Sequence, residues 1–91
     1  MNIDNGLHVL DFTGEGCMPC RLQAPMFHQA AEELAGVADF HTIDVAQQPA
    51  LVARFGVMSI PTIVLVKDGE ECWRSVGLTE KDEIVQAVRA L

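Results

Sequence analysis

The chain has 91 residues, a length that suits one domain spanning residues 1–91, because so short a chain cannot close two independent cores. Its 6 basic and 13 acidic side chains give a net charge of −7, and nucleic acid or an anionic membrane repels such a surface. Length and charge therefore exclude a multidomain enzyme and argue against a nucleic-acid partner.

The apolar residues are distributed as in a folded protein without a membrane span. They make up 49% of the chain, as in ordinary globular domains, and no apolar run approaches the roughly 18 residues that cross a bilayer. The first residues, 1–6, lack the basic and apolar regions of a signal peptide. We expect a soluble cytoplasmic protein with no membrane partner.

Short apolar runs alternate with longer amphipathic stretches, which predicts the order β-α-β, a short helix, then β-β-α. The predicted strands are residues 8–12, 40–44, 62–66 and 72–76, and the predicted helices are residues 19–35, 49–55 and a final helix capped by Thr79. A right-handed crossover makes the first two strands parallel, and Asp68-Gly69 suits a hairpin turn between the last two. Helices should cover both faces of the sheet.

Periodicity also predicts which helix faces are buried. In the long helix, which Pro25 should kink and Gly36 should end, Gln23 falls on the polar face. The apolar face of this helix comprises Leu22, Met26, Phe27, Ala30, Ala31 and Leu34. In the last helix, where Asp82 would follow the cap at the third position, the buried stripe comprises Ile84, Val85, Val88 and Leu91.

Cys17-Met-Pro-Cys20 follows a strand and a loop and opens the long helix, the context in which a C-x-x-C pair is redox-active. A thiolate at the first helical position meets unpaired N–H groups and the positive end of the helix dipole, so the pKa of Cys17 should be lowered. Cys17 is then the nucleophile, and Cys20, almost one turn later, is the resolving thiol. Pro19 presets the first turn.

Two plainer interpretations of the cysteines remain, a zinc site and inert core thiols. Zinc needs four ligands, and beyond Cys72 only three histidines are available, none in a second paired spacing. We therefore expect no metal and no cofactor. Cys72 is interpreted as a structural or incidental thiol.

Two further residues carry chemical signals. Asp11 lies in an apolar strand, where a buried carboxyl should be neutral, paired or near solvent. With a raised pKa it would accept the proton of Cys20; the alternative is an ordinary carboxylate that faces water. Pro61 precedes another apolar strand, and proline alone makes a cis peptide inexpensive, although trans is the default.

These features occur in one order, which resembles the thioredoxin family from about Leu7 to Leu91. The matching residues are Asp11-Phe12, Cys17-Met-Pro-Cys20 with Pro25, Ile60-Pro61-Thr62, Lys67-Asp-Gly69 and Gly77. The resemblance implies an α/β thioredoxin fold with a four-stranded mixed sheet flanked by helices, without the usual first strand and helix. Residues 40–44 would then form an edge strand. The protein should be a monomer, with pairing of two copies along this open edge as the alternative.

The resemblance also implies roles for individual residues. Asp11 matches the proton-relay aspartate, Cys17 the nucleophile, Cys20 the resolving cysteine and Pro61 the cis-proline that faces the disulfide. A protein substrate would meet Gly16, Met18, Pro19, Ile60, Pro61 and Gly77. The chain departs from the family at Gly16 and Thr13, where tryptophans are usual, at Met18, where glycine is usual, and at Phe40, near the usual site of a lysine.

The leading hypothesis is an enzyme, a thioredoxin-like thiol–disulfide oxidoreductase that reduces disulfide-containing proteins and is itself reduced by a thioredoxin-reductase-like donor. A glutaredoxin-like, glutathione-linked reductase is the second, although few basic residues flank the motif to bind the carboxylates of glutathione. A non-enzymatic, redox-switched binding module is the third, and the replacement of both tryptophans is its main support.

Overall fold

The computed structural model describes residues 1–91, and its elements follow the order that the sequence predicts. They are β1 (Leu7–Thr13), α1 (Met18–Glu33), β2 (Asp39–Asp44), α2 (Pro49–Phe55), β3 (Thr62–Lys67), β4 (Glu70–Val76) and α3 (Lys81–Arg89). None of the helices has the length and apolar content that crossing a bilayer requires.

The strands form one mixed, four-stranded sheet in the order β2-β1-β3-β4. β1 pairs in parallel with β2 and antiparallel with β3, and β3 pairs antiparallel with β4. The turn between β3 and β4 places Asp68 at φ 49° and Gly69 at φ 85°, in the left-handed region that these residue types tolerate. The parallel first unit, the hairpin and the edge position of β2 are all confirmed.

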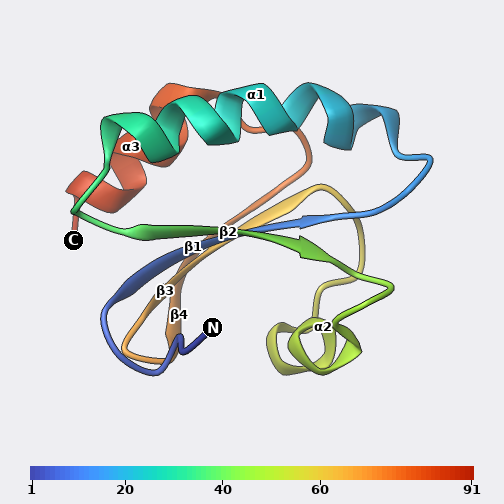
Figure 1. The fold of residues 1–91 in the computed structure, drawn as a ribbon, viewed down its shortest axis with the longest axis horizontal. Coiled ribbons are helices and arrows are strands. Elements are labelled where there is room, and N and C mark those ends of the chain that lie inside the picture. Colours follow the sequence, from blue (N-terminus) through green and yellow to red (C-terminus); the bar gives the residue numbers. More distant parts are fainter.

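Helices cover both faces of the sheet, with α1 and α3 on one side and α2 on the other (Figure 1). Successive strand residues point to opposite faces, so the sheet divides the core into two parts. The part beneath α1 and α3 contains Val9, Phe27, Ala30, Leu34, Ile63, Leu65, Ile84, Val85 and Val88. The part beside α2 contains Ile3, Leu10, Phe12, Ile43, Phe55, Val64 and Val66.

The predicted buried face of α1 is wrong in its first half. Leu22 is 55% exposed and Gln23 is fully buried, the reverse of the expectation. Residues four apart turn about 40° further around a helix at each step, so a row that is buried at Ala30 and Leu34 has rotated away from the core by Leu22. The buried positions are instead Cys20, Gln23, Phe27 and Ala30, with Leu34 as the C-cap.

The ends of two helices also differ from the prediction. α1 continues through Pro25 and ends at Glu33, before Gly36. The N-cap of α3 is Glu80, not Thr79, because the Thr79 hydroxyl bonds to Ser75 Oγ and to the Gly77 carbonyl and is unavailable to the helix. Asp82 is therefore the second helical residue. Leu91 lies beyond the end of α3 and is 53% exposed.

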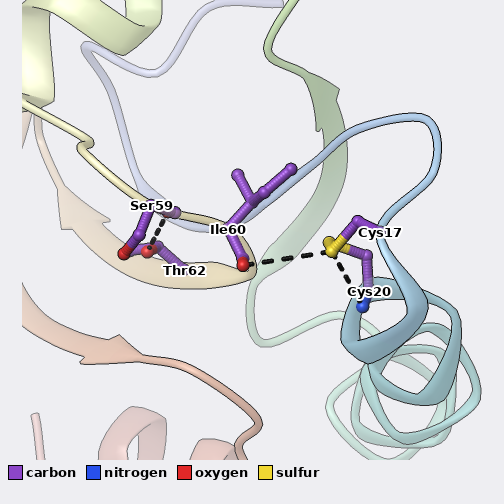
Figure 2. The surroundings of a disulfide bond; sticks show 5 residues. All are labelled: Cys17, Cys20, Ser59, Ile60 and Thr62. Atoms are coloured by element: carbon purple, nitrogen blue, oxygen red, sulfur yellow. Dashed lines mark hydrogen bonds between the residues drawn. A yellow bond between two sulfur atoms is a disulfide. The ribbon is translucent and has the colours of Figure 1, made fainter.

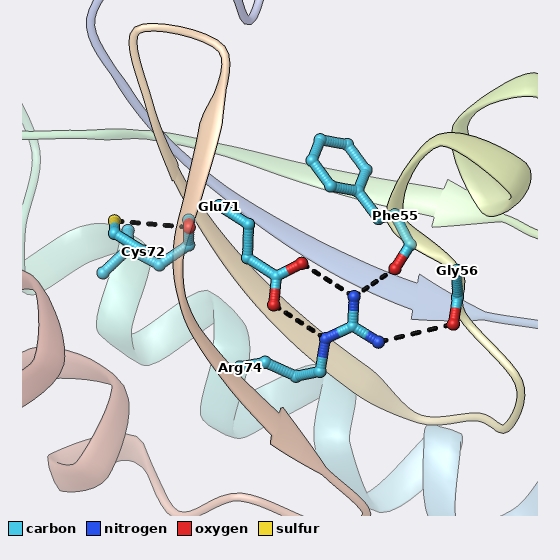
Figure 3. Close-up of polar contacts among 6 residues, drawn as sticks. Phe55, Gly56, Glu71, Cys72 and Arg74 are labelled. Carbon is cyan, nitrogen blue, oxygen red and sulfur yellow. Dashed lines mark hydrogen bonds and ion pairs between the residues drawn. The ribbon is translucent and has the colours of Figure 1, made fainter.

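A guanidinium group joins β4 to the end of α2 (Figure 3). Arg74 donates to both carboxylate oxygens of Glu71, at 2.9 and 2.7 Å, and also to the carbonyls of Phe55 and Gly56. These carbonyls belong to the last turn of α2 and lack helical partners. Arg74 thus fastens the start of the loop that leads to Pro61.

Candidate active site

Three chain segments meet at one end of the sheet. The loop after β1 leads into α1 and carries Cys17, and the loop before β3 reaches the same end because β3 is antiparallel to β1 (Figure 1). The third segment follows β4, where the Gly77 N–H donates to the Pro61 carbonyl at 2.8 Å. The sequence predicted site residues in all three segments, and the fold brings them together.

Cys17 and Cys20 form a disulfide, with their Cα atoms 5.2 Å apart. Cys20 is 4% exposed, whereas Cys17 is half-buried and borders solvent. Only one sulfur of the pair is therefore open to an external reactant. This asymmetry is the arrangement that a nucleophilic and a resolving thiol require.

Cys17 is the N-cap of α1 rather than its first helical residue, because its backbone is extended, at φ −99° and ψ 101°. Its Sγ accepts a hydrogen bond from the Cys20 N–H at 3.2 Å. Met18 and Pro19 then occupy the first two helical positions. The cap position still directs unpaired N–H groups at the Cys17 sulfur, which favours its anionic form once the disulfide is reduced.

The carbonyl of Ile60 points at the disulfide (Figure 2). Its oxygen lies 3.9 Å from Cys17 Sγ; this sulfur has no proton in the disulfide, so the approach is a contact, and only the thiol form has a proton to donate. The Ile60–Pro61 peptide is cis, as the family resemblance implies. The Thr62 hydroxyl donates to the Ser59 carbonyl at 2.8 Å and fixes the loop on the other side of Pro61.

Asp11 is almost completely buried, at 2% exposure, so the alternative that it faces water is wrong. It lies two residues after Val9 and opposite Ile63 in β3, and alternation along the strand therefore places it on the sheet face that α1 covers. Its Oδ1 has no hydrogen-bond partner. Burial raises the pKa of Asp11 to about 6, and the direction of this shift confirms the expectation.

No cation replaces the lysine that usually accompanies this aspartate in the family. Phe40 packs its ring against Phe27, with the ring centroids 5.1 Å apart. Desolvation is the only cause of the Asp11 pKa shift, so no neighbouring charge stabilises the carboxylate. Asp11 therefore holds its proton more firmly than an exposed carboxyl.

Exposed apolar side chains occur in all three segments of the site, and the sequence predicts only some of them. Met18, which the sequence predicts as a substrate contact, is 61% exposed, and Leu78, next to the predicted contact Gly77, is 48% exposed. Met58 and Val76, which were missed, are 94% and 64% exposed. The exposure of Met58 could have been predicted from the sequence, since it is an apolar residue in a loop without the periodicity that would bury it.

The remaining cysteine and histidines lie outside this site. Cys72 is an exposed residue of β4 with a free thiol. Its Sγ is 3.4 Å from the Leu65 carbonyl (Figure 3), and partial desolvation of the sulfur raises the pKa of Cys72. His8 and His41 share a ring-to-ring hydrogen bond of 2.9 Å across β1 and β2, a pairing that the sequence did not predict. No group of three or more ligating side chains is arranged around a metal position.

Comparison with known proteins agrees with this geometry. The thioredoxin family model matches residues 1–90. A thioredoxin of Chlamydia muridarum is 41% identical over 87 residues, which cover 96% of this chain and 84% of that protein. A thioredoxin of Staphylococcus haemolyticus is 37% identical over the same shares of the two chains.

Solved structures give the same result. A mutant thioredoxin from Halobacterium salinarum superposes with a TM-score of 0.84 at 33% identity, covering 96% of this chain and 75% of that one. A thioredoxin of Malassezia sympodialis superposes with a TM-score of 0.85 at 26% identity, covering 97% and 78%. The chain therefore belongs to the thioredoxin family, and its Cys17–Cys20 pair supports thiol–disulfide oxidoreductase chemistry.

Proposed function

We propose that this protein is a protein-disulfide reductase, a dithiol electron carrier that cycles Cys17 and Cys20 between thiol and disulfide. The observation that carries the proposal is the unequal exposure of the pair at a helix N-terminus, because Cys17 is only half-buried whereas Cys20 is 4% exposed. The proposal includes action as a single domain in the cytoplasm, where the reducing environment keeps such pairs cycling.

The reaction proceeds in two exchange steps. The Cys17 thiolate attacks one sulfur of a substrate disulfide; the substrate S–S bond breaks, a mixed disulfide forms, and the departing substrate thiolate takes up a proton. Cys20 then loses its proton and attacks Cys17 Sγ, which releases the second substrate thiolate and closes the Cys17–Cys20 disulfide. Two electrons pass to the substrate, and a thioredoxin-reductase-like donor returns two electrons to the pair.

Asp11 is the proposed acceptor of the Cys20 proton. Its pKa of about 6 leaves it mostly ionised near neutral pH, yet basic enough to take a proton during the second step. Its position on the sheet face beneath α1 supports this role, because Cys20 is a buried residue of the same helix. Asp11 then passes the proton to solvent as the cycle is completed.

The proposed substrate surface comprises Gly16, Met18, Pro19, Ile60, Pro61 and Gly77. The closeness of Ile60 to Cys17 and the hydrogen bond between Gly77 and Pro61 support a continuous surface across the three segments. The exposed side chain of Met18 adds an apolar part to this surface, and Met58, in the loop that carries Ile60, is exposed as well. We expect protein segments next to a disulfide to be the substrates.

Insulin-disulfide reduction, with dithiothreitol as the electron source, tests the proposal directly. Wild type should turn over, and Cys17→Ser should be inactive. Reduced Cys20→Ser, freed of dithiothreitol before insulin is added, should accumulate a mixed disulfide with the substrate that mass spectrometry detects. Cys72→Ser is the matched control and should keep wild-type turnover. Wild-type turnover in Cys17→Ser would disprove the nucleophile assignment.

The same assay separates the competing functions. Replacing dithiothreitol with glutathione, glutathione reductase and NADPH should give little turnover, and rapid turnover there would favour the glutathione-linked alternative. A wild-type protein that is inert with either donor, while its disulfide still opens and closes, would favour the redox-switched binding module.

A further inference from the structure

A buried amide on α1 bonds both main-chain groups of a single loop residue. Gln23 lies three residues after Cys20 and is fully buried. Its Nε2 donates to the Thr79 carbonyl at 2.9 Å, and its Oε1 accepts from the Thr79 N–H at 2.8 Å. Thr79 is also fully buried, so this side chain replaces the partners that a strand or water would otherwise supply.

The loop held in this way is part of the proposed substrate surface. Thr79 lies in the short connection from β4 to α3, which passes beside α1 in Figure 1. The Thr79 hydroxyl lies 3.1 Å from the Gly77 carbonyl, and the Gly77 N–H bonds to the Pro61 carbonyl at 2.8 Å. A chain of contacts therefore connects α1 to the disulfide by way of the other two segments. It runs from Gln23 through Thr79, Gly77, Pro61 and Ile60 to Cys17.

The need to fill the core does not explain why a glutamine occupies position 23. An apolar side chain of similar size would fill the same volume without the cost of burying a polar group. A buried polar group that has both partners specifies one arrangement of the elements it joins. Here the joined elements are the helix that carries both cysteines and the loop that carries Gly77.

We propose that Gln23 is a positioning residue, which holds the Gly77–Thr79 loop in register with the active-site helix so that a protein substrate meets a preformed surface. The inference rests on the proposed reductase function and adds to it a residue that touches neither the sulfurs nor the substrate. Small disulfides, which reach Cys17 without the loop, do not depend on this bridge.

The first test is Gln23→Met, which keeps the volume and removes both hydrogen bonds, with the exposed Gln29→Met on the same helix as its matched control. For the reduced variant we expect kcat/KM with insulin to fall by about tenfold, since misplacement by 1 Å costs up to about a hundredfold. The rate with hydroxyethyl disulfide should stay within about twofold of wild type. Gln29→Met should match wild type on both substrates.

The second test is Gln23→Glu. It allows activity measurements to decide the question even if Gln23→Met does not fold. A protonated carboxyl has one O–H donor and one C=O acceptor, like the amide, whereas a carboxylate only accepts. The ratio of variant to wild-type activity with insulin should therefore rise as the pH is lowered from about 8 to about 6. The same ratio measured with hydroxyethyl disulfide is the control for any change that the new carboxyl makes in the pKa values of the thiols, and it should stay flat.

The outcomes separate this inference from the function on which it rests. Equal losses on insulin and hydroxyethyl disulfide for Gln23→Met, or no loss on insulin, would overturn the positioning role, as would a flat ratio for Gln23→Glu. A wild-type protein that reduces neither substrate would instead overturn the reductase proposal. Amide hydrogen exchange at Thr79 adds a readout without activity: it should be much faster in Gln23→Met than in Gln29→Met.

Discussion

At the scale of single residues, Asp11 combines an ionisable group with nearly complete burial. Its carboxyl is 2% exposed, its Oδ1 has no partner, and its pKa is raised to about 6 from the ordinary 3.8. A structural residue in this place would be apolar, because desolvating a carboxylate destabilises the fold. A carboxyl that costs stability and lies beneath the active-site helix is expected where the reaction needs a base.

The cost of Asp11 should appear as a pH dependence of stability. Below the unfolded pKa of 3.8 the carboxyl is neutral in both states. As the pH rises to about 6 the unfolded chain ionises first, so stability falls, and it levels off above that pH. Asp11→Asn removes this fall, so its stability relative to wild type should improve by about 2 kcal/mol between about pH 4 and about pH 8.

Urea denaturation of the oxidised proteins at about pH 4 and about pH 8 measures this change. Comparing the two pH values cancels any constant cost of burying the asparagine amide. Glu32→Gln, on the exposed side of α1, is the control and should show no such difference. A relative stability of Asp11→Asn that does not change with pH would show that the carboxyl is not desolvated in the folded protein.

At the scale of elements, the loop that carries Ile60 is held at both ends. At the start of the loop, Arg74 of β4 donates hydrogen bonds to the carbonyls of Phe55 and Gly56. At the end of the loop, the Thr62 hydroxyl donates to the Ser59 carbonyl. Arg74 itself is held by a bidentate ion pair with Glu71. The side chains of Arg74 and Glu71 are 28% and 33% exposed. The loop that carries Ile60 is thus positioned in part by Arg74 of β4, the edge strand next to β3.

Replacing Arg74 should loosen this attachment. Arg74→Met keeps the aliphatic stem but leaves Glu71 and the end of α2 without partners, and we expect a loss of about 1 to 3 kcal/mol in the free energy of unfolding. Urea denaturation measures the loss. Arg89→Met, at a more exposed ion pair with Glu33, should change stability by less than about 1 kcal/mol. Equal effects of the two variants would refute a special role for Arg74.

The order of the elements could be predicted because each depends on a local pattern. Asp68-Gly69 identified the hairpin, and Pro49 followed by Gly56 gave the limits of α2. The burial of Asp11 was predictable too, since apolar residues lie on both sides of it in the strand. Gln23 was assigned to solvent because a glutamine on a helix usually lies there; its partner Thr79 is 56 residues away, and no local pattern contains that contact.

At the scale of the whole molecule, the net charge of −7 should select among substrates that present the same disulfide. Long-range attraction raises the rate at which oppositely charged partners meet, and salt screens it. Apolar contacts around Cys17 respond to moderate salt much less than charge attraction does. The net charge therefore governs the rate at which a substrate meets the protein, and the three segments around the disulfide govern the thiol–disulfide exchange that follows.

Two peptides with one cysteine pair and opposite flanking charges test this selection. For the basic peptide, kcat/KM should fall several-fold as salt is raised from about 20 to about 300 mM, and for the acidic peptide it should rise. An uncharged peptide serves as the control and should respond little. Identical salt responses of the basic and acidic peptides would show that the charge plays no part in the encounter.

Trp73 is the only tryptophan of a chain that has no tyrosine. It lies on β4 opposite Leu65, half-buried against the core beneath α1 and α3, while Thr13 and Gly16 leave the approach to Cys17 without an indole ring. Intrinsic fluorescence therefore reports the packing of that core and is nearly blind to the state of the disulfide. Unfolding and oxidation can then be followed separately in one sample. Tryptophan emission measures unfolding, and the number of free thiols measures oxidation.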